Sequence, residues 1–325
     1  MTEDLVKDLV EDFFSAITEH DPNQERHARR KINRGLGELW EFGVKPVLDE
    51  LGFTQMPPPG RSGPRVWWVG SGLLNVLPIP AAGYHDSDPP QTVLDHVVSS
   101  YTFIVKSLSY ARERAAKAAQ VPNAILFSMP TTPNETPLPF VETEIGAIKQ
   151  LLENSSIPTT IQVNPLRVDA LSKLPIYAIA HFACHGSSES DPSRSNLLLE
   201  DLETKPLTVL DFVSLNIESA RFAYLSACHT SAMKNIRLLD ESINLSAAIQ
   251  LSGYPSVVGS LWQVKDTCSA EIAKDVYEWI LRDSNFDPER SAEGLHKAVH
   301  QLQERTRIMN KHDPLAWTSF IHVGI

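Results

Sequence analysis

Two apolar segments of the chain lead directly into residues that can carry nucleophilic chemistry. The segment IYAIAHFAC precedes His185 and Gly186, and the segment ARFAYLSAC ends at Cys228. A thiolate attacks carbonyl carbon, and an imidazole accepts or delivers the proton that this reaction moves. Glycine allows close approach of the backbone, so the N–H groups of Gly186 and Cys228 can stabilise an oxyanion. These residues predict a dyad of catalytic His185 and nucleophilic Cys228.

Both segments are typical of central strands in a parallel sheet, because they are apolar almost throughout. Short apolar segments predict strands over Arg65–Val69, Ala124–Phe127, Thr160–Val163, Tyr177–Cys184, Ala220–Ala227, Ser256–Leu261 and Ser319–Val323. Apolar residues at helical spacing predict helices near Thr92–Ala119, Phe140–Glu153, Ile243–Ser252, Cys268–Leu281 and Ser291–Arg307. This alternation indicates crossover connections. If the two strands are neighbours, His185 and Cys228 lie side by side at the carboxyl edge of the sheet, where open sheets form their sites.

The first 55 residues predict a separate helical segment (1–55). Leu5, Leu9 and Phe13 recur at helical spacing, and a second helix is expected over about 23–51, with a kink at Pro46. Residues 56–64 are rich in Pro and Gly and predict a linker, which leaves 65–325 as the main domain. The second helix carries a basic cluster that is expected to face solvent, with a docking patch as the alternative; its members are Arg26, Arg29, Arg30, Lys31 and Arg34.

Plain structural roles compete with the chemical ones. Buried cysteines are usually inert apolar residues, so Cys184 is expected in the core, and His181 is expected there or behind the reacting histidine. His229 adjoins Cys228, and consecutive residues of a strand point apart. Cys268 lies at a helix start, where packing is its expected role. These alternatives leave His185 as the preferred base.

No metal or cofactor is expected. The cysteines and histidines near the two strand ends lack the four-ligand spacing of a closed zinc site. His296 and His300 are four residues apart on a predicted helix, but the glutamate of an HExxH motif is missing. Gly70-Ser71-Gly72 is only a fragment of a nucleotide-binding motif.

The composition excludes several classes of protein. The chain has 325 residues, of which 42% are hydrophobic and 21% charged, so it can bury a large core. A net charge of −11 argues against binding to nucleic acid or to an anionic membrane surface. No apolar stretch approaches the roughly 18 residues of a membrane span. Three cysteines are too few for a disulfide framework, and the chain is expected to be cytoplasmic.

The chain resembles the CHAT family, within the caspase- and separase-like clan of cysteine peptidases. The segments that carry the resemblance are VWWVGSGLLNVLPIPAAG (66–83), VLDHVVSSYT (93–102), HFACHG (181–186), NLLLED (196–201), LSACHT (225–230) and LSGYPSVVGSLWQV (251–264). The resemblance implies a caspase-hemoglobinase fold, with a mostly parallel sheet of about six strands between helices. It also implies catalytic roles for His185 and Cys228, which the strand-end argument reaches separately.

The chain departs from its relatives at two positions. Pro80 replaces a histidine that relatives often have, and it lies far from the dyad in the chain. Ser226 stands where clan members that select basic residues have an acid, so a preference for Arg or Lys cannot be carried over. Candidate members of a specificity pocket are Ser226, Asp240, Glu241 and Asp266; helix capping is the competing role of the three acids.

The sequence therefore predicts a cysteine endopeptidase that acts on protein substrates and is regulated by partners or processing. The substrate is expected along the carboxyl edge of the sheet, flanked by a hairpin in the insertion Ser187–Pro206. The alternative is a non-catalytic interaction domain on the same fold. In either case the N-terminal helices are the expected site for a regulatory protein partner.

Overall fold

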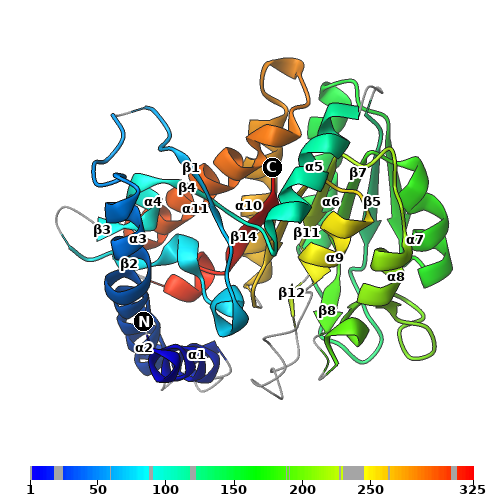
Figure 1. The fold of residues 1–325 in the computed structure, drawn as a ribbon. Coiled ribbons are helices and arrows are strands. Elements are labelled where there is room, and N and C mark those ends of the chain that lie inside the picture. Colours follow the sequence, from blue (N-terminus) through cyan, green and yellow to red (C-terminus); the bar gives the residue numbers. More distant parts are fainter. Residues whose placement is uncertain are drawn as a thin grey trace.

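The large central sheet has eight strands in the order β1-β4-β14-β13-β11-β7-β5-β6 (Figure 1). The computed structural model describes residues 2–17, 25–58, 60–87, 91–117, 122–187, 189, 191–226, 228–229, 245–262, 264–308 and 313–325. The strands are β1 (Arg65–Trp68), β4 (Val98–Tyr101), β5 (Ala124–Ser128), β6 (Thr159–Val163), β7 (Ile179–Ala183), β11 (Phe222–Leu225), β13 (Ser256–Ser260) and β14 (Phe320–Gly324). The predicted α/β architecture is confirmed, with eight strands rather than about six.

The sheet consists of two parallel blocks that run in opposite directions. β13, β11, β7, β5 and β6 form one block, and β14, β4 and β1 form the other. The blocks meet at the antiparallel pair β13–β14. β5, β7 and β11 are buried at every position, because helices cover both faces of the sheet. The sheet is therefore mostly parallel, as the continuous apolar strands predicted.

Helices pack on both faces of the sheet. They are α1 (Glu3–Ile17), α2 (Glu25–Leu39), α3 (Lys45–Glu50), α4 (Val93–His96), α5 (Val105–Lys117), α6 (Val141–Asn154), α7 (Arg167–Lys173), α8 (Val209–Ser214), α9 (Leu245–Ser252), α10 (Asp266–Ile280) and α11 (Ser291–Ile308). α10 packs against α6 and α11, while α9 packs against α8 and α5, which lie in front of the sheet in Figure 1. Neighbouring residues of β7 show the two faces: His181 contacts Tyr277 of α10, and Phe182 contacts Phe212 of α8.

The single helix predicted over Thr92–Ala119 is wrong. The structure has α4, then β4, then α5 in this region. Val98 and Tyr101 are buried and β-branched or aromatic, and β4 fills the place between β1 and β14. Apolar spacing along the chain cannot report that pairing, because it depends on strands that are distant in sequence.

The N-terminal helices pack on the rest of the molecule. α2 continues through a π-helical turn, Trp40–Val44, into α3, and Pro46 lies in the first turn of α3, where a missing N–H costs little. Members of the basic cluster form ion pairs: Lys31 and Arg34 with Asp12, and Arg29 with Asp313. Among the described residues, 51–58 and 60–64 contain no helix or strand.

A small sheet continues from the carboxyl ends of β7 and β11. Its order is β10-β9-β8-β12, and its strands are β8 (His185–Ser187), β9 (Asn196–Leu198), β10 (Leu207–Thr208) and β12 (Cys228–His229). β9 and β10 are antiparallel, which confirms the predicted hairpin after β8. A further pair, β2 (Gly83–Tyr84) and β3 (Gln91–Thr92), lies apart from it. The two candidate catalytic residues therefore belong to the small sheet rather than to the large one.

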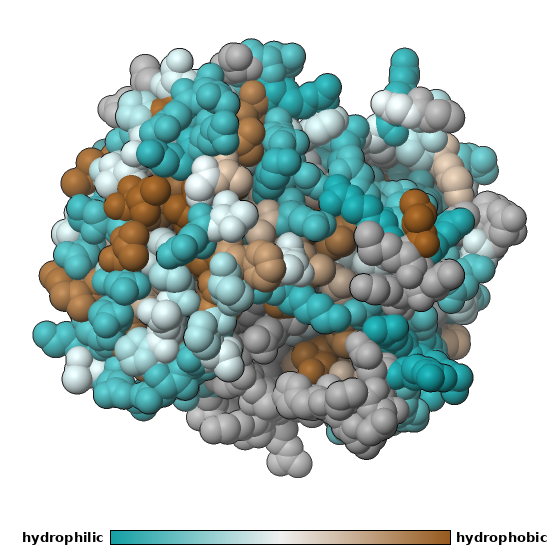
Figure 2. Space-filling view, turned by 180° about the vertical axis from the view of Figure 1, so that it is seen from behind, coloured by the Kyte–Doolittle hydropathy of each residue, from teal (hydrophilic) through white to brown (hydrophobic). Residues whose placement is uncertain are grey.

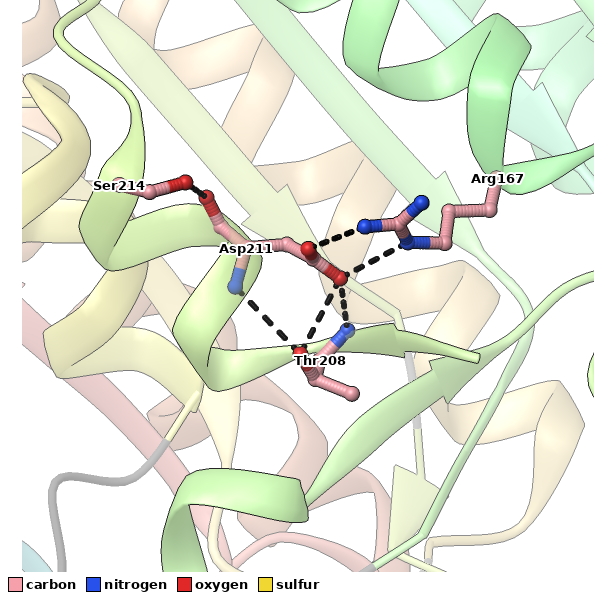
Figure 3. A network of polar contacts seen from close by, with 4 residues as sticks. All are labelled: Arg167, Thr208, Asp211 and Ser214. Carbon is pink, nitrogen blue, oxygen red and sulfur yellow. Dashed lines mark hydrogen bonds and ion pairs between the residues drawn. The ribbon is translucent and has the colours of Figure 1, made fainter. Parts of the chain in front are cut away.

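A polar network fixes the connection from β10 into α8 (Figure 3). The Asp211 carboxylate accepts hydrogen bonds from the Arg167 guanidinium at 2.5 and 3.0 Å, and from the Thr208 backbone N–H at 2.9 Å. The Thr208 hydroxyl caps the helix by accepting from the Asp211 N–H. This network anchors the far end of the hairpin to α7.

The edge strand β6 leaves apolar surface exposed. Figure 2 shows apolar side chains gathered on the side of the molecule that carries α7. Exposed apolar residues of this region are Val163, Leu166, Val168 and Ile176.

None of the helices in the described part of the chain combines the length and the apolar character that crossing a bilayer requires.

Candidate active site

The backbone brings His185 and Cys228 into register. β7 and β11 are parallel neighbours in the large sheet, with Phe182 opposite Leu225. The Ser226 N–H donates to the Phe182 carbonyl at 2.9 Å, which extends this pairing beyond β11. In the small sheet, β12 is parallel to β8, and Cys228 lies opposite His185. Residues opposite each other in neighbouring strands lie on the same face of a sheet.

The His185 imidazole is held by a backbone carbonyl. Its Nε2 lies 2.8 Å from the carbonyl oxygen of Thr136. A carbonyl only accepts, so Nε2 carries the hydrogen and Nδ1 of the neutral ring keeps its lone pair. Nδ1 is buried and has no hydrogen-bond partner among the described residues. The contact therefore makes Nδ1 the basic nitrogen of this histidine.

The loop between β5 and α6 presents that carbonyl. The Met129 N–H donates to the Ala183 carbonyl, and the Leu138 N–H donates to the Pro130 carbonyl, both at 2.9 Å. The first bond ties the loop to the end of β7, and the second closes the loop around Thr136. At its tip, the Asn134 amide donates to Glu203 at 2.6 Å, in the turn of the β9–β10 hairpin. The loop position is thus fixed at both ends and at its tip.

Gly186 lies in the middle of the small sheet. It is opposite His229 of β12 on one side and Leu197 of β9 on the other. Its backbone is therefore adjacent to the strand that carries Cys228. The predicted oxyanion role of the Gly186 and Cys228 N–H groups stays a prediction at this point.

A buried carboxylate lies beneath the candidate dyad. The Ser226 hydroxyl donates to Oε2 of Glu144 at 3.0 Å. Oε1 of the same carboxylate lies 3.1 Å from Nε2 of His181, and both side chains are almost completely buried. The His181 ring also stacks on Tyr224, at 5.1 Å between ring centroids. His181 is therefore a core residue, as predicted, and its ring lies against the Glu144 carboxyl group without a hydrogen bond between them.

Asp266, the first residue of α10, lies in the same region. Its Oδ2 accepts a hydrogen bond from the Phe140 N–H at 2.8 Å. The pKa of the Asp266 carboxyl is raised, mainly because the group is partly buried. The Glu144 carboxyl also raises it, whereas the hydrogen bond from the Phe140 N–H and the nearby His185 lower it. Asp266 thus lies within electrostatic range of both Glu144 and His185. Of the other acids predicted for a pocket, Asp240 and Glu241 lie outside the described residues.

The two other cysteines are in environments that suppress reactivity. Cys184 is buried, as predicted for a core residue. Burial raises the pKa of the Cys268 thiol, so the thiolate is a smaller fraction at neutral pH than for a free cysteine. Neither cysteine belongs to an acidic or histidine cluster of metal-binding type within the described part of the chain.

The N-terminal helix α1 lies beside the segment that follows β13. The ring of Phe13 contacts the ring of Trp262 at 6.1 Å between centroids, and both residues are buried. In Figure 1, α1 lies towards the same end of the molecule as β8 and β12. The helical segment therefore contributes to the packing at the carboxyl edge of β13.

Two residues of this region are missing from the sequence-based prediction. Thr136 acts through its carbonyl, which any residue has, so its type carries no signal. Glu144 does carry a signal, because it lies within the stripe of buried residues on α6, whose other members are Val141, Ile145, Ile148 and Leu152. An acid in an apolar stripe, together with His181 in an apolar strand, predicts a buried pair.

The chain matches one family model and is similar to several solved structures. The CHAT domain model matches residues 33–325. The structure is similar to gingipain R, an Arg-specific cysteine proteinase, with a TM-score of 0.51 and 11% identity over 91% of this chain and 67% of that chain. It is also similar to a complex of the Porphyromonas gingivalis pro- and mature domains of that proteinase, with a TM-score of 0.51 and 12% identity over 99% of this chain and 76% of that chain.

A third similarity is to Saccharomyces cerevisiae separase in a separase–securin complex, with a TM-score of 0.56 and 13% identity. That match covers 100% of this chain but only 23% of the separase chain. No sequence among the curated proteins matches this chain significantly. These structural similarities show that the chain shares its fold with gingipain R and with part of separase, and the match over residues 33–325 shows that the chain belongs to the CHAT domain family.

Proposed function

We propose that this protein is a cysteine endopeptidase that cleaves protein substrates. The observation that carries the proposal is the register of β8 and β12, in which Cys228 lies directly opposite His185. The contact between His185 Nε2 and the Thr136 carbonyl supports it, because it leaves Nδ1 as a base. Membership of the CHAT family agrees with this chemistry.

In the proposed reaction, the Cys228 thiol transfers its proton to Nδ1 of His185, and the thiolate attacks the scissile carbonyl carbon. The backbone N–H groups of Gly186 and Cys228 stabilise the oxyanion. The C–N bond then breaks, and Nδ1 returns the proton to the leaving amine. Water, deprotonated by the same nitrogen, hydrolyses the thioester and regenerates the thiol.

The specificity pocket is proposed to involve Ser226 and Asp266, together with Asp240 and Glu241 of the segment after β12. Asp266 supports this proposal because its carboxylate is only partly buried and lies within electrostatic range of His185. Profiling a peptide library with Asp266→Asn tests its part: an unchanged preference at the residue before the cleaved bond would exclude Asp266.

The central test is cleavage of proteome-derived peptides by the purified protein and by Cys228→Ala and His185→Ala. Each variant is expected to lose at least about 10³-fold in activity, because the members of a dyad act as one unit. Cys268→Ala is the matched control and is expected to keep full activity. Cleavage that survives Cys228→Ala contradicts the proposal.

The alternative, a non-catalytic interaction domain, makes the opposite prediction for iodoacetamide labelling. A catalytic Cys228 reacts faster than Cys184 and Cys268, since one of these is buried and the other has a raised pKa. Equal labelling of the three cysteines in native protein, with no peptide cleaved, supports the alternative.

A further inference from the structure

Glu144 is a carboxylate on the apolar face of α6. The neighbouring residues on this face, Val141, Ile145 and Ile148, are buried against the sheet, and the Glu144 side chain is only 1% exposed. Removing a carboxylate from water is unfavourable unless its oxygens are paired. A helix that needed only to cover the sheet would have an apolar residue here.

The two oxygens of Glu144 reach two different strands. Oε1 lies 3.1 Å from Nε2 of His181, within β7, and Oε2 accepts the Ser226 hydroxyl at 3.0 Å, immediately after β11. His181 precedes His185 by one four-residue step, and Ser226 comes shortly before Cys228. One carboxylate thus links the two strands just before they deliver the dyad.

The same part of the chain also holds the reacting imidazole. Thr136, in the loop that leads into α6, accepts from His185, and the Phe140 N–H at the start of α6 donates to Asp266. The segment from Thr136 to Glu144 therefore contacts β7, β8, the residue after β11 and the start of α10. Its contacts are two backbone groups and one side chain, and only Glu144 can be changed without altering the backbone.

We propose that Glu144 is a positioning residue of the active site: by accepting the hydrogen bond of Ser226 while its other oxygen lies against His181, it sets the distance between Cys228 and His185. This proposal rests on the proposed function. Glu144 touches no reacting atom and acts through the two strand ends. Misplacing a reacting group by about 1 Å can cost on the order of 10²-fold in rate, so loss of this link weakens catalysis without removing the dyad.

A purely structural role makes a different prediction. If Glu144 only stabilised the core, removing the Ser226 hydroxyl would lower the stability slightly and leave the reactivity of Cys228 unchanged. If Glu144 positions the dyad, the reactivity of Cys228 falls even where the melting temperature does not. The two roles separate in a variant that folds normally, and Ser226 offers that variant because its side chain is only half-buried.

The test compares Ser226→Ala, Ser226→Thr and the wild type. Measured quantities are the iodoacetamide alkylation rate of Cys228, kcat and KM on a cleaved peptide, and the melting temperature. Ser226→Ala is expected to lower the alkylation rate and kcat by about 10-fold. Ser226→Thr keeps the hydroxyl and is expected to recover most of both rates. Alkylation uses a small reagent, so it does not depend on substrate binding.

The matched control is Ser252→Ala, which removes a buried hydroxyl that donates to the Ile249 carbonyl of α9, away from the dyad. It is expected to leave the Cys228 rate unchanged. Glu144→Gln is the second variant: its amide oxygen still accepts from Ser226, but an amide NH₂ replaces the oxygen that faces His181, so an intermediate rate is expected.

Three results overturn the proposal, and they can be distinguished from one another. A wild-type Cys228 that labels no faster than Cys184 and Cys268 refutes the proposed function and this inference with it. Selective labelling of Cys228 that Ser226→Ala leaves unchanged refutes only the positioning role of Glu144. A rate in Ser226→Thr as low as in Ser226→Ala also refutes the positioning role, since the hydroxyl would then be irrelevant.

Discussion

Two buried histidines lie in opposite halves of the same sheet and face different side chains. His322, on β14, is surrounded by hydroxyls: Nε2 lies 2.8 Å from Ser256 Oγ and 3.0 Å from Ser291 Oγ, and Nδ1 lies 2.9 Å from Ser100 Oγ. Burial and the nearby Arg65 guanidinium hold the pKa of His322 well below its usual value. His322 is therefore a neutral core residue.

His181, on β7, instead faces the Glu144 carboxylate. Both histidines are buried, so burial alone does not explain why one of them lies against a carboxyl group. Hydroxyls satisfy an imidazole at a smaller desolvation cost than a carboxylate does. The carboxylate, which has the larger desolvation cost, lies beneath the strands that lead to His185 and Cys228. The hydroxyls lie in the block that carries no candidate catalytic residue. The comparison indicates that the carboxylate serves the site rather than the core.

The largest expected difference between these two regions is in stability. Glu144→Ala removes a buried side chain from the packed face of α6 and leaves the Ser226 hydroxyl without its acceptor, and it is expected to cost about 2–5 kcal/mol in the free energy of unfolding. His322→Leu removes bonds to hydroxyls that can find other partners, and about 1–3 kcal/mol is expected. Urea denaturation measures both values.

A double variant sharpens this prediction. Replacing Glu144 and His181 together by Leu removes both buried polar groups and is expected to recover most of the stability, but not the alkylation rate of Cys228. Equal costs for Glu144→Ala and His322→Leu would contradict the comparison.

The next effect is in the pH dependence of stability. The unfolded chain protonates His322 near pH 6.5, but the folded chain does not, so folding stability is complete above this pH and is lost as the pH falls. The advantage of the wild type over His322→Leu is expected to shrink by about 1 kcal/mol per pH unit between pH 6 and 5. Burial also lowers the pKa of His296, to about 4. His296 is present in both the wild type and His322→Leu, so its contribution cancels in the difference between their stabilities. Parallel pH profiles would show that His322 is charged in the folded state.

The smallest effect is expected far from both histidines, in the network of Figure 3. Asp211→Asn weakens the pairing with the partly exposed Arg167, and about 1 kcal/mol of stability is expected to be lost. Alkylation of Cys228 is expected to stay within about 2-fold of the wild type, as measured by mass spectrometry of the labelled peptide. A larger fall in the alkylation rate would show that the hairpin, and not only Glu144, positions the dyad.

The strands around the site were predictable because their sequences are unusual. β7 and β11 lie in apolar segments that fit only a sheet covered on both faces, and each segment is followed by residues that cannot continue it. β4 was not predictable, because VVSSY gains its strand conformation from β1 and β14 on either side. Local spacing favoured one long helix there, and tertiary pairing overrode it.

The sequence by itself determined the residue types at the strand ends, the order of His185 before Cys228, and the mostly parallel sheet. Those features depend on side-chain chemistry and on hydrophobic patterns that are local in the chain. Only the tertiary structure decided that Cys228 lies opposite His185, that the Thr136 carbonyl holds the imidazole, and that Glu144 joins Ser226 to His181. Each of these contacts joins elements far apart in sequence, and a backbone carbonyl or a single buried acid leaves no periodic pattern from which its partner can be identified.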